Sequence, residues 1–313
     1  MAEPVVVADQ VAKRWGSTQA LSSATFTVGR GITGLLGANG AGKTTLLTLI
    51  LGLHRPDGGS LTVLGCDPVK AGPAVRARIG YAPEHDGLPP DVAAHDMVRH
   101  IAEIHGLPGR VATARASDAL YEVGLGEERF RPVGTMSTGQ RQRVKLAQAI
   151  VHDPALVLLD EPTNGLDPVQ REQMLALIRH VGHDLGLDVI LSSHLLDEVE
   201  RVSDAVVIIE QGHATVGGRM DELRNAGANE LVVTLDDPAG AALVVTGLHH
   251  RQVTATDAGQ GRVVVALTDD VVFDAVRDEV ARIGLGVRAM KVRTRSLEEV
   301  FLAGQLTSEV SPR

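Results

Sequence analysis

Short runs of almost wholly apolar residues recur along this chain, and each has the length of one β-strand. Four of them are ITGLLG at 32–37, ALVLLD at 155–160, DVILSS at 188–193 and AVVIIE at 205–210. Continuous apolarity is typical of strands that are buried on both faces, as in a parallel sheet covered by helices. Helical patterns follow several of these runs, so we expect an α/β layer structure.

Two other patterns surround this expected core. The N-terminal runs PVVVADQV at 4–11 and ATFTVGRG at 24–31 alternate apolar with polar residues, as half-exposed antiparallel strands do. Between residues 89 and 153 the strand signals fade, and DMVRHIAEIHGL and RASDALYEVGL have helical periodicity. We therefore expect an antiparallel β subdomain at the N-terminus and a helical subdomain at about 89–153.

After residue 225 the pattern changes again. ELVVTL, RQVTAT, RVVVAL and VRAMKV are interpreted as strands, and PAGAALVVTGL and DDVVFDAVRDEVARIG as helices. The order βαββαβ is the ferredoxin-like arrangement. The sequence thus predicts a domain at 1–224, a small α+β accessory domain at 225–303, and a disordered tail, GQLTSEVSPR, at 304–313.

Composition narrows the choice of partner and compartment. The 30 basic and 39 acidic residues give a net charge of −9, with no basic stripe, so no nucleic-acid partner is expected. The single cysteine, Cys66, excludes an internal disulfide and fits a reducing compartment. The N-terminus does not resemble a signal peptide, and no run approaches the ~18 apolar residues that span a bilayer. We expect a soluble chain whose membrane role, if any, comes through a partner.

The first chemical motif is GANGAGKTT at 37–45, between an apolar strand and the helical run TTLLTLILGL. Gly37, Gly42, Lys43 and Thr44 fit G-x-x-x-x-G-K-[ST], a loop whose backbone N–H groups point at phosphate oxygens. Lys43 can neutralise phosphate charge, and Thr44 offers a hydroxyl to Mg²⁺. The motif and its context predict a nucleotide-binding protein.

An acidic pair follows the run ALVLLD. Asp160 and Glu161 stand at the carboxyl end of a predicted buried strand, where open α/β sheets bind their ligands. Asp160 is suited to hold Mg²⁺, and Glu161 can polarise the water that attacks the γ-phosphate. The alternative interpretation of these two residues is a solvated acidic pair at a strand end. The phosphate loop and the acidic pair together would also fit a GTPase, a kinase or a helicase.

A second polar cluster, MSTGQ at 136–140, opens a basic helix. It offers N–H groups and the Ser137 hydroxyl to an anion, or it is an ordinary helix cap. The basic residues that follow, Arg141, Arg143 and Lys145, are predicted to lie on a solvated face of that helix, with a position near phosphate as the alternative.

The run MSTGQRQRVKLAQAIVHDPALVLLDEPTNGLDP resembles the signature motif, helix and acidic strand of ATP-binding cassette (ABC) ATPases. His194, in DVILSSHLLDEVE, falls where this family has its switch histidine, and Trp15 falls where it stacks an aromatic ring on adenine. These motifs occur in the family's order over roughly the first 220 residues. The resemblance implies an α/β P-loop ATPase fold with mixed sheet core, β subdomain and helical subdomain, and it implies ATP and Mg²⁺ as ligands.

The resemblance also implies roles for individual residues. ATP contacts are implied for Trp15, Gly37, Asn39, Gly40, Gly42, Lys43, Thr44, Thr45, Ser137, Gly139 and Gln140. Catalytic roles are implied for Glu161, His194 and Lys43, and Mg²⁺ contacts for Thr44, Asp160 and Glu84. Asn164, Gly165, Leu166 and Asp167 correspond to the loop that senses the opposite subunit.

In this family two cassettes pair head to tail, and each ATP lies between one subunit's phosphate loop and the other's signature motif. One cassette per chain implies a second ATPase subunit, as a homodimer or with a paired relative. Three positions depart from the family pattern: Thr138 replaces a glycine, Trp15 the commoner tyrosine, and Glu84 a glutamine. We expect Thr138 to alter the rate and Trp15 to keep a stacking face. Glu84 either keeps an oxygen near the metal or is a solvated loop residue.

The closing run RTRSLEEVFLAG, after the βαββαβ segment, resembles the C-terminal extension of ABC-2-type export ATPases. That group serves drug, sodium and polysaccharide export and copper-site assembly. The resemblance therefore implies an ATPase subunit on the cytoplasmic face of the cell membrane that powers export through a separate integral membrane permease. The alternatives are a soluble ABC ATPase acting in translation or DNA repair, and a regulatory role for the C-terminal module.

Overall fold

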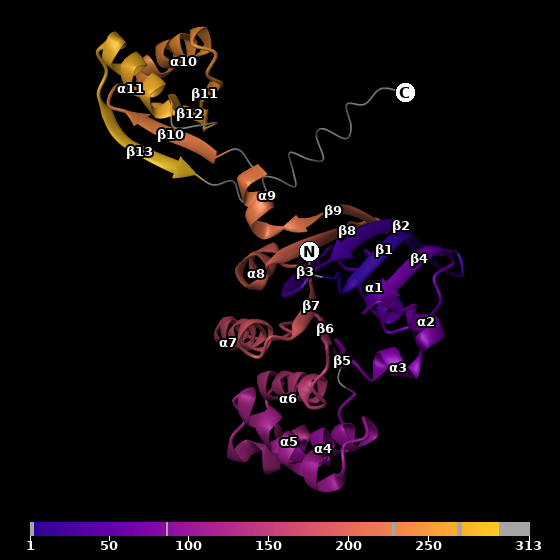
Figure 1. Cartoon of the computed structure of the whole chain (residues 1–313). Coiled ribbons are helices and arrows are strands. Elements are labelled where there is room, and N and C mark those ends of the chain that lie inside the picture. Colours follow the sequence, from indigo (N-terminus) through magenta and orange to yellow (C-terminus); the bar gives the residue numbers. More distant parts are fainter. Residues whose placement is uncertain (1–2, 86, 227–228, 268–270, 294–313) are drawn as a thin grey trace. The chain divides into compact units, whose positions relative to one another are not determined.

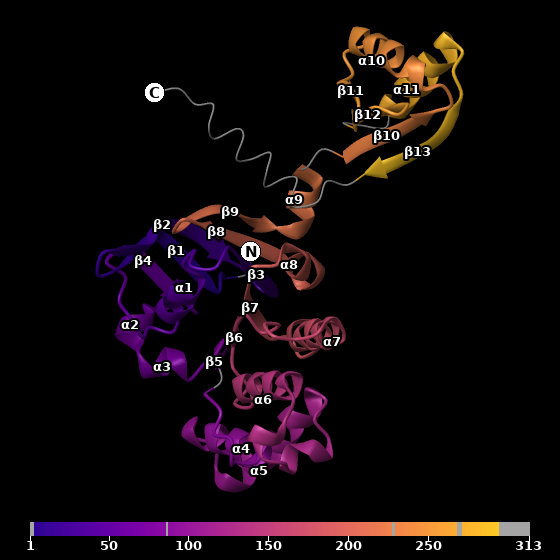
Figure 2. The same cartoon turned by 180° about the vertical axis from the view of Figure 1, so that it is seen from behind.

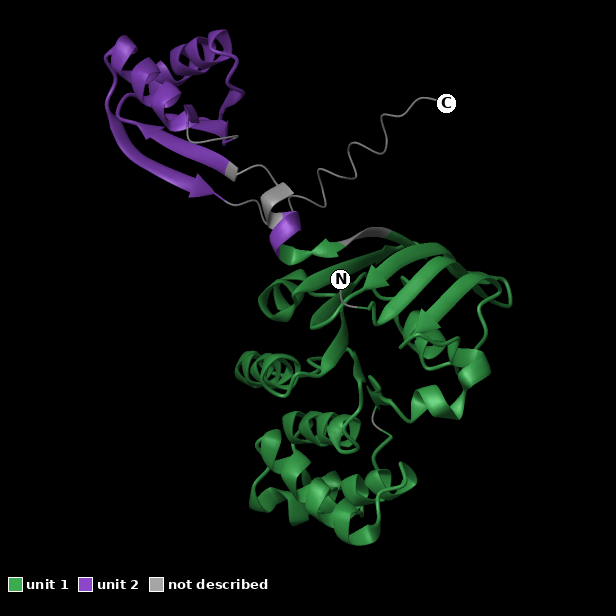
Figure 3. Cartoon of the chain, viewed as in Figure 1, with its two compact units in different colours: residues 1–220 green, residues 221–313 purple. Residues whose placement is uncertain are grey.

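The computed structural model describes residues 3–85, 87–226, 229–267 and 271–293. They form two compact units, residues 1–220 and 221–313, which are coloured separately in Figure 3. The predicted tail at 304–313 and the run TRSLEEVFLA at 294–303 that precedes it lie outside the described residues. Among the described residues, no helix is both long and apolar enough to cross a membrane.

A curled nine-stranded mixed sheet runs through the first unit (Figure 1 and Figure 2). In spatial order its strands are β4 (Gly58–Val63), β1 (Val6–Trp15), β2 (Thr18–Val28), β9 (His213–Arg219), β8 (Ala205–Glu210), β3 (Ile32–Leu36), β7 (Asp188–Ser193), β6 (Leu156–Asp160) and β5 (Ile79–Ala82). The strands β5, β6, β7, β3 and β8 are parallel neighbours, whereas β1 pairs with β2 and β4 antiparallel.

The continuous apolar runs are the strands buried on both faces. In β6, Val157 and Leu159 belong to the hydrophobic core on one side of the sheet, and Leu156 and Leu158 belong to the core on the other side. Successive side chains of a strand point to opposite faces, so only a wholly apolar strand suits this position. The alternating runs form β1 and β2, which expose part of their residues. Both expectations are confirmed.

Helices cover the two faces and form a separate group below the sheet in Figure 1. The helices outside that group are α1 (Lys43–Ile50), α2 (Pro68–Ala71), α3 (Pro73–Arg76), α7 (Pro168–Arg179) with the π-helical turn η3 (His180–Asp184), and α8 (Leu196–Val202). The helical group consists of α4 (Ala94–Ile104), α5 (Gly109–Glu122), the 3₁₀ turns η1 (Glu127–Phe130) and η2 (Val133–Thr135), and α6 (Thr138–Ile150). The run from α4 to α6 has no strand, as the fading of strand signals predicts.

After the helix α9, the second unit has the element order βαββαβ, which confirms the ferredoxin-like arrangement. Its elements are the helix α9 (Met220–Ala226, whose first residue belongs to the first unit), β10 (Asn229–Leu235), η4 (Pro238–Gly240), α10 (Ala241–His250), β11 (Ala255–Asp257), β12 (Arg262–Leu267), α11 (Val271–Ile283) and β13 (Val287–Arg293). The strands form an antiparallel sheet in the order β11-β12-β10-β13. The run PAGAALVVTGL is a helix despite its β-branched residues, because Val244 and Leu248 fall on one helical face and pack in the core of this unit.

Candidate active site

The phosphate-loop sequence connects β3 to α1, and its backbone geometry requires glycine. Gly42, the N-cap of α1, has a φ of 112°, and a Cβ there would lie 2.5 Å from the carbonyl oxygen of Ala20. A Cβ on Gly37 would lie 2.4 Å from the carbonyl oxygen of Ile209. Among the residues that the structure describes, no side chain caps the start of α1, so the first N–H groups of this helix are available to an anion.

Lys43, the first residue of α1, is buried and connects this loop to the end of β6. Its Nζ donates to the carbonyl oxygen of Gly37 at 2.7 Å and lies 3.1 Å from Oε1 of Glu161. The side chains of Lys43 and Glu161 are 6% and 7% exposed, so both charges are shielded from water. The loop and the acidic strand end therefore meet through one buried ion pair.

Asp160 lies at the same place with hydroxyl groups around it. The Ser192 hydroxyl donates to Oδ1 of Asp160 at 2.6 Å and accepts from the backbone N–H of Glu161 at 2.9 Å. Burial raises the pKa of the Asp160 carboxyl, the hydroxyls of Ser192 and Thr44 lower it, and the negative charge of Glu84 raises it further. Carboxylate and hydroxyl oxygens of this kind suit Mg²⁺.

Glu161 contacts the predicted switch histidine. Its Oε2 lies 2.8 Å from Nδ1 of His194, which follows β7. Glu161 is thus held between a lysine and an imidazole. Its φ of 47° lies in the left-handed region, a costly conformation for a residue that is not glycine. Strained, buried carboxylates of this kind cluster at functional sites.

Trp15 ends β1 beside the phosphate-loop helix. Its Nε1 donates to Oγ1 of Thr45 at 3.3 Å. The centroids of its ring and of the His54 ring lie 4.7 Å apart in an edge-to-face arrangement. The residue is 40% exposed, which is unusual for the one tryptophan of the chain. An exposed indole next to an anion site can stack on a base.

The MSTGQ cluster begins α6, which lies apart from α1 in both views (Figure 1 and Figure 2). Oγ of Ser137 accepts from the N–H of Gln140 at 3.2 Å, and Oε1 of Gln140 accepts from the N–H of Ser137 at 3.1 Å. These two reciprocal hydrogen bonds form a capping box. Within one chain, the MSTGQ cluster is therefore the ordinary helix cap that the sequence allowed as an alternative. Ser137 remains exposed, and Thr138, as the first residue of the helix, has the backbone conformation in which a β-carbon is tolerated.

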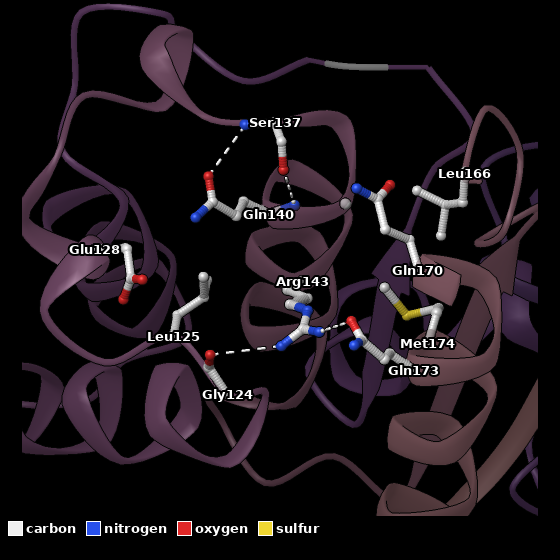
Figure 4. Close-up of a pocket in the computed structure, with 11 residues that line it drawn as sticks. Gly124, Leu125, Glu128, Ser137, Gln140, Arg143, Leu166, Gln170, Gln173 and Met174 are labelled. Carbon is white, nitrogen blue, oxygen red and sulfur yellow. Dashed lines mark hydrogen bonds between the residues drawn. The ribbon is translucent and has the colours of Figure 1, made fainter. Parts of the chain in front are cut away.

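A cavity of about 340 Å³ opens beside this cluster (Figure 4). Arg143 reaches into it, donating to the carbonyl oxygen of Val123 at 3.2 Å and to Oε1 of Gln173 at 2.8 Å. Ser137, Gly139 and Gln140 line the same cavity. Arg143 therefore connects α5, α6 and α7 and does not lie on a merely solvated face.

The prediction that Lys145 lies on a solvated face is wrong. Lys145 is 2% exposed, and its Nζ donates to the carbonyl oxygens of Pro83 and Glu84 at 2.8 and 2.9 Å. Residues two apart on a helix point to different sides, so Lys145 faces the loop after β5 whereas Arg143 lines the cavity. The helix that begins with MSTGQ thereby anchors the loop that carries Glu84.

We expect Lys145→Met to destabilise the protein by about 1–3 kcal/mol, because it leaves two inward-facing carbonyl oxygens without their charged donor. Lys70→Met is the matched control, since the Lys70 side chain is 79% exposed. Urea unfolding followed by circular dichroism measures both variants. Equal midpoints for the two would show that this anchor contributes nothing to stability.

Glu84 also contacts the loop between β6 and α7. Its Oε1 accepts from Nδ2 of Asn164 at 3.0 Å, and Asp167 of the same loop caps α7 by accepting from the N–H of Gln170 at 2.8 Å. Glu84 is thus neither isolated nor fully solvated: its charge acts on Asp160 and its oxygen is bonded to Asn164.

Sequence reasoning missed two site residues, Ser192 and Lys145. A polar residue inside the apolar run DVILSS is the signal that could have identified Ser192, because a buried hydroxyl needs a partner. No comparable signal marked Lys145.

Comparison with known proteins agrees with this geometry. The family model described as ABC transporter matches residues 21–164. The chain is 32% identical to the daunorubicin resistance ATP-binding protein DrrA3 of Streptomyces coeruleorubidus over 305 residues, covering 96% of each chain. This chain belongs to the ABC transporter ATP-binding proteins. It is an ATP-binding subunit and an ATPase of that family.

Other relatives of this ABC ATPase extend over nearly the whole chain. The bacitracin transport ATP-binding protein BcrA of Enterococcus faecalis is 29% identical and covers 96% of each chain. Among solved structures, an ATP-binding subunit of an ABC transporter matches with a TM-score of 0.63 and 27% identity, covering 71% of this chain and 92% of that one. The ADP- and phosphate-bound dimer of the cassette MJ0796, at 22% identity and a TM-score of 0.62, shares the fold.

Proposed function

We propose that this ABC ATPase powers export through a separate membrane permease from the cytoplasmic face of the cell membrane. The observation that carries the proposal is the match to export and resistance proteins along nearly the whole chain, C-terminal unit included. The names of these relatives refer to daunorubicin resistance and bacitracin transport. A further relative is the linearmycin resistance ATP-binding protein LnrL of Bacillus subtilis, at 29% identity over 94% of this chain.

In this proposal the phosphate loop binds the ATP phosphates. The N–H groups of the loop and of the α1 N-terminus face the phosphates, and Lys43 moves from the Gly37 carbonyl oxygen to the γ-phosphate. Trp15, beside Thr45, stacks on adenine. The remaining contacts on this side come from Asn39, Gly40, Gly42 and Thr44.

The Mg²⁺ ion would be held by Thr44, Asp160 and Glu84. When bound, this ion would neutralise part of the negative charge of the phosphates. The burial of Asp160, together with the Thr44 hydroxyl and the nearby charge of Glu84, supports this assignment.

Glu161 is the proposed general base. When Lys43 turns to phosphate, one oxygen of Glu161 is released to accept a proton from the attacking water, while His194 holds the other oxygen. His194, partly exposed at the end of β7, then lies where it can orient that water and contact the γ-phosphate.

We further propose that each ATP is shared by two subunits. Ser137, Gly139 and Gln140 line an exposed helix start that lies apart from α1 of the same chain, so an anion bound there comes from a second copy. In such a dimer the loop from Asn164 to Asp167 faces the partner. A triphosphate then bridges both subunits, and hydrolysis removes the bridge.

Subunit mixing tests the shared site. Lys43→Met and Ser137→Arg are each expected to abolish ATP hydrolysis, and a 1:1 mixture is expected to recover roughly a quarter of wild-type activity, because a C2 heterodimer keeps one intact composite site. Mixing Lys43→Met with Glu161→Gln is the control, since both defects then lie on the same half of the site and neither composite site is intact. Recovery in neither mixture, with pairing shown by chromatography, contradicts the shared site.

We assign ATP hydrolysis to the cassette at 1–224 and an accessory role to 225–303.

The export role is tested by co-purification. The protein is tagged, native membranes are extracted in mild detergent, and the proteins that co-purify are identified. A stoichiometric multi-span protein supports it. Recovery only with ribosomes or DNA favours the soluble ABC ATPase of translation or repair.

A further inference from the structure

Glu198, on α8, is a buried carboxylate that the proposed reaction does not use. Its side chain is 0% exposed. Oε2 accepts from Oγ1 of Thr163 at 2.7 Å and from Oγ of Ser193 at 2.9 Å, and Oε1 lies 3.1 Å from Nε of Arg171. A buried carboxylate is costly unless it is paired and hydrogen-bonded, and here three groups from three segments meet it.

Each of the three partners belongs to a different part of the site. Thr163 follows Glu161 by two residues, and its carbonyl oxygen accepts from the N–H of Leu166 at 3.2 Å, in the loop that faces the partner subunit in the proposed dimer. Ser193 is the last residue of β7, directly before His194, and its hydroxyl accepts from the N–H of Leu195 at 3.0 Å.

Arg171 is the third partner and lies in the first turns of α7, the helix that Asp167 caps. One carboxylate thus joins the segment after β6, the segment after β7 and the start of α7.

We propose that Glu198 is a positioning residue that couples the partner-facing loop, 164–167, to the pair Glu161 and His194. The three segments that it holds carry the loop, the base and the switch histidine, so a displacement of the loop on dimer closure is transmitted to the 2.8 Å contact between Glu161 and His194. This inference rests on the proposed function of those two residues and assigns the group that aligns them.

A merely structural role makes a different prediction. A buried carboxylate that only stabilises the fold lowers stability when it is neutralised and leaves the turnover of the folded fraction unchanged. A positioning role lowers kcat with little effect on ATP affinity, because small displacements at a reacting centre have large effects on rate.

The C-terminal unit offers a matched control. Glu279 is also a buried carboxylate, 2% exposed, and it pairs with Arg251 and Arg282. Glu279→Gln removes the same charge in the same kind of environment, at a residue outside the ATP site.

The experiment compares kcat, the KM for ATP and urea unfolding for the full-length wild type, Glu198→Gln and Glu279→Gln. For Glu198→Gln we expect kcat to fall between about 10- and 100-fold while KM changes less than about 2-fold. For Glu279→Gln we expect a similar loss of stability with kcat unchanged. Equal kcat values for the two variants, whether both normal or both reduced, overturn the positioning role.

Ser193→Ala and Ser193→Thr cover the case in which Glu198→Gln does not fold. Ser193→Ala removes one hydroxyl from Glu198 and is expected to lower kcat in the same way, whereas Ser193→Thr keeps the hydroxyl and is expected to restore it. Equal kcat in these two variants also overturns the inference. A wild type without ATP turnover, even with its membrane partner, contradicts the proposed function instead, so the two failures are distinct.

Discussion

Replacing Glu161 with glutamine is expected to lower the rate of ATP hydrolysis by roughly 10²–10⁴-fold while ATP still binds. The amide has nearly the shape of the carboxylate, but it cannot take a proton from water. The substitution also removes a negative charge that faces phosphate, so the ATP-bound state is favoured. The variant is therefore expected to accumulate as an ATP-bound dimer.

Steady-state phosphate release and size-exclusion chromatography with ATP measure these two effects. Glu172→Gln is the matched control, because Glu172 is exposed on α7 and pairs with Arg201 outside the site. It should leave turnover and dimer population unchanged. Near-normal turnover in Glu161→Gln would place the catalytic base elsewhere.

Lys43→Met is expected to weaken ATP binding by roughly 10- to 150-fold, the range that corresponds to losing one charged hydrogen bond to phosphate. The same variant is expected to lower the free energy of unfolding without nucleotide by about 3 kcal/mol, because it leaves the buried Glu161 without its cation. Two separate losses from one substitution follow from the position of Lys43 between the loop and the strand end.

The double variant Lys43→Met with Glu161→Gln separates the loss of ATP affinity from the loss of stability. It should recover most of the stability, because no charge is left unpaired, and none of the affinity for phosphate. Isothermal titration with a non-hydrolysable ATP analogue and urea unfolding give the two quantities, with Lys70→Met as a control. Unchanged ATP affinity in Lys43→Met would exclude contact between this lysine and phosphate.

The strands that carry this site could be predicted because their physical requirement is simple. A strand buried on both faces needs uninterrupted apolar residues, and ALVLLD and DVILSS satisfy that requirement. The order of the strands could not be read from the sequence, because it depends on which crossovers pack best. Polar residues directly after these strands, Glu161 and His194, could be placed together because parallel strands end at one edge.

The contacts that support the site residues could not be predicted. Whether a charged side chain is buried depends on how its helix is rotated about its own axis, and the sequence does not give that rotation. Arg143 and Lys145 are two residues apart on one helix, yet Lys145 is buried under the loop after β5 while Arg143 lines a cavity. Glu198 stands in the acidic run DEVERV, and the sequence does not show which of its carboxylates faces inward. The helix α8 packs on β3 and β7 with Val199 and Val202 buried, and this orientation of the helix also buries Glu198.

The hydrophobic core of the second unit has a consequence for how such a protein can change over generations. Leu231, Val244, Val263, Val276 and Val280 pack with one another and with other residues of that unit. A core tolerates simultaneous hydrophobic substitutions when its total volume and its pattern of apolar positions are kept. These five positions can therefore change together over generations while the unit keeps its fold.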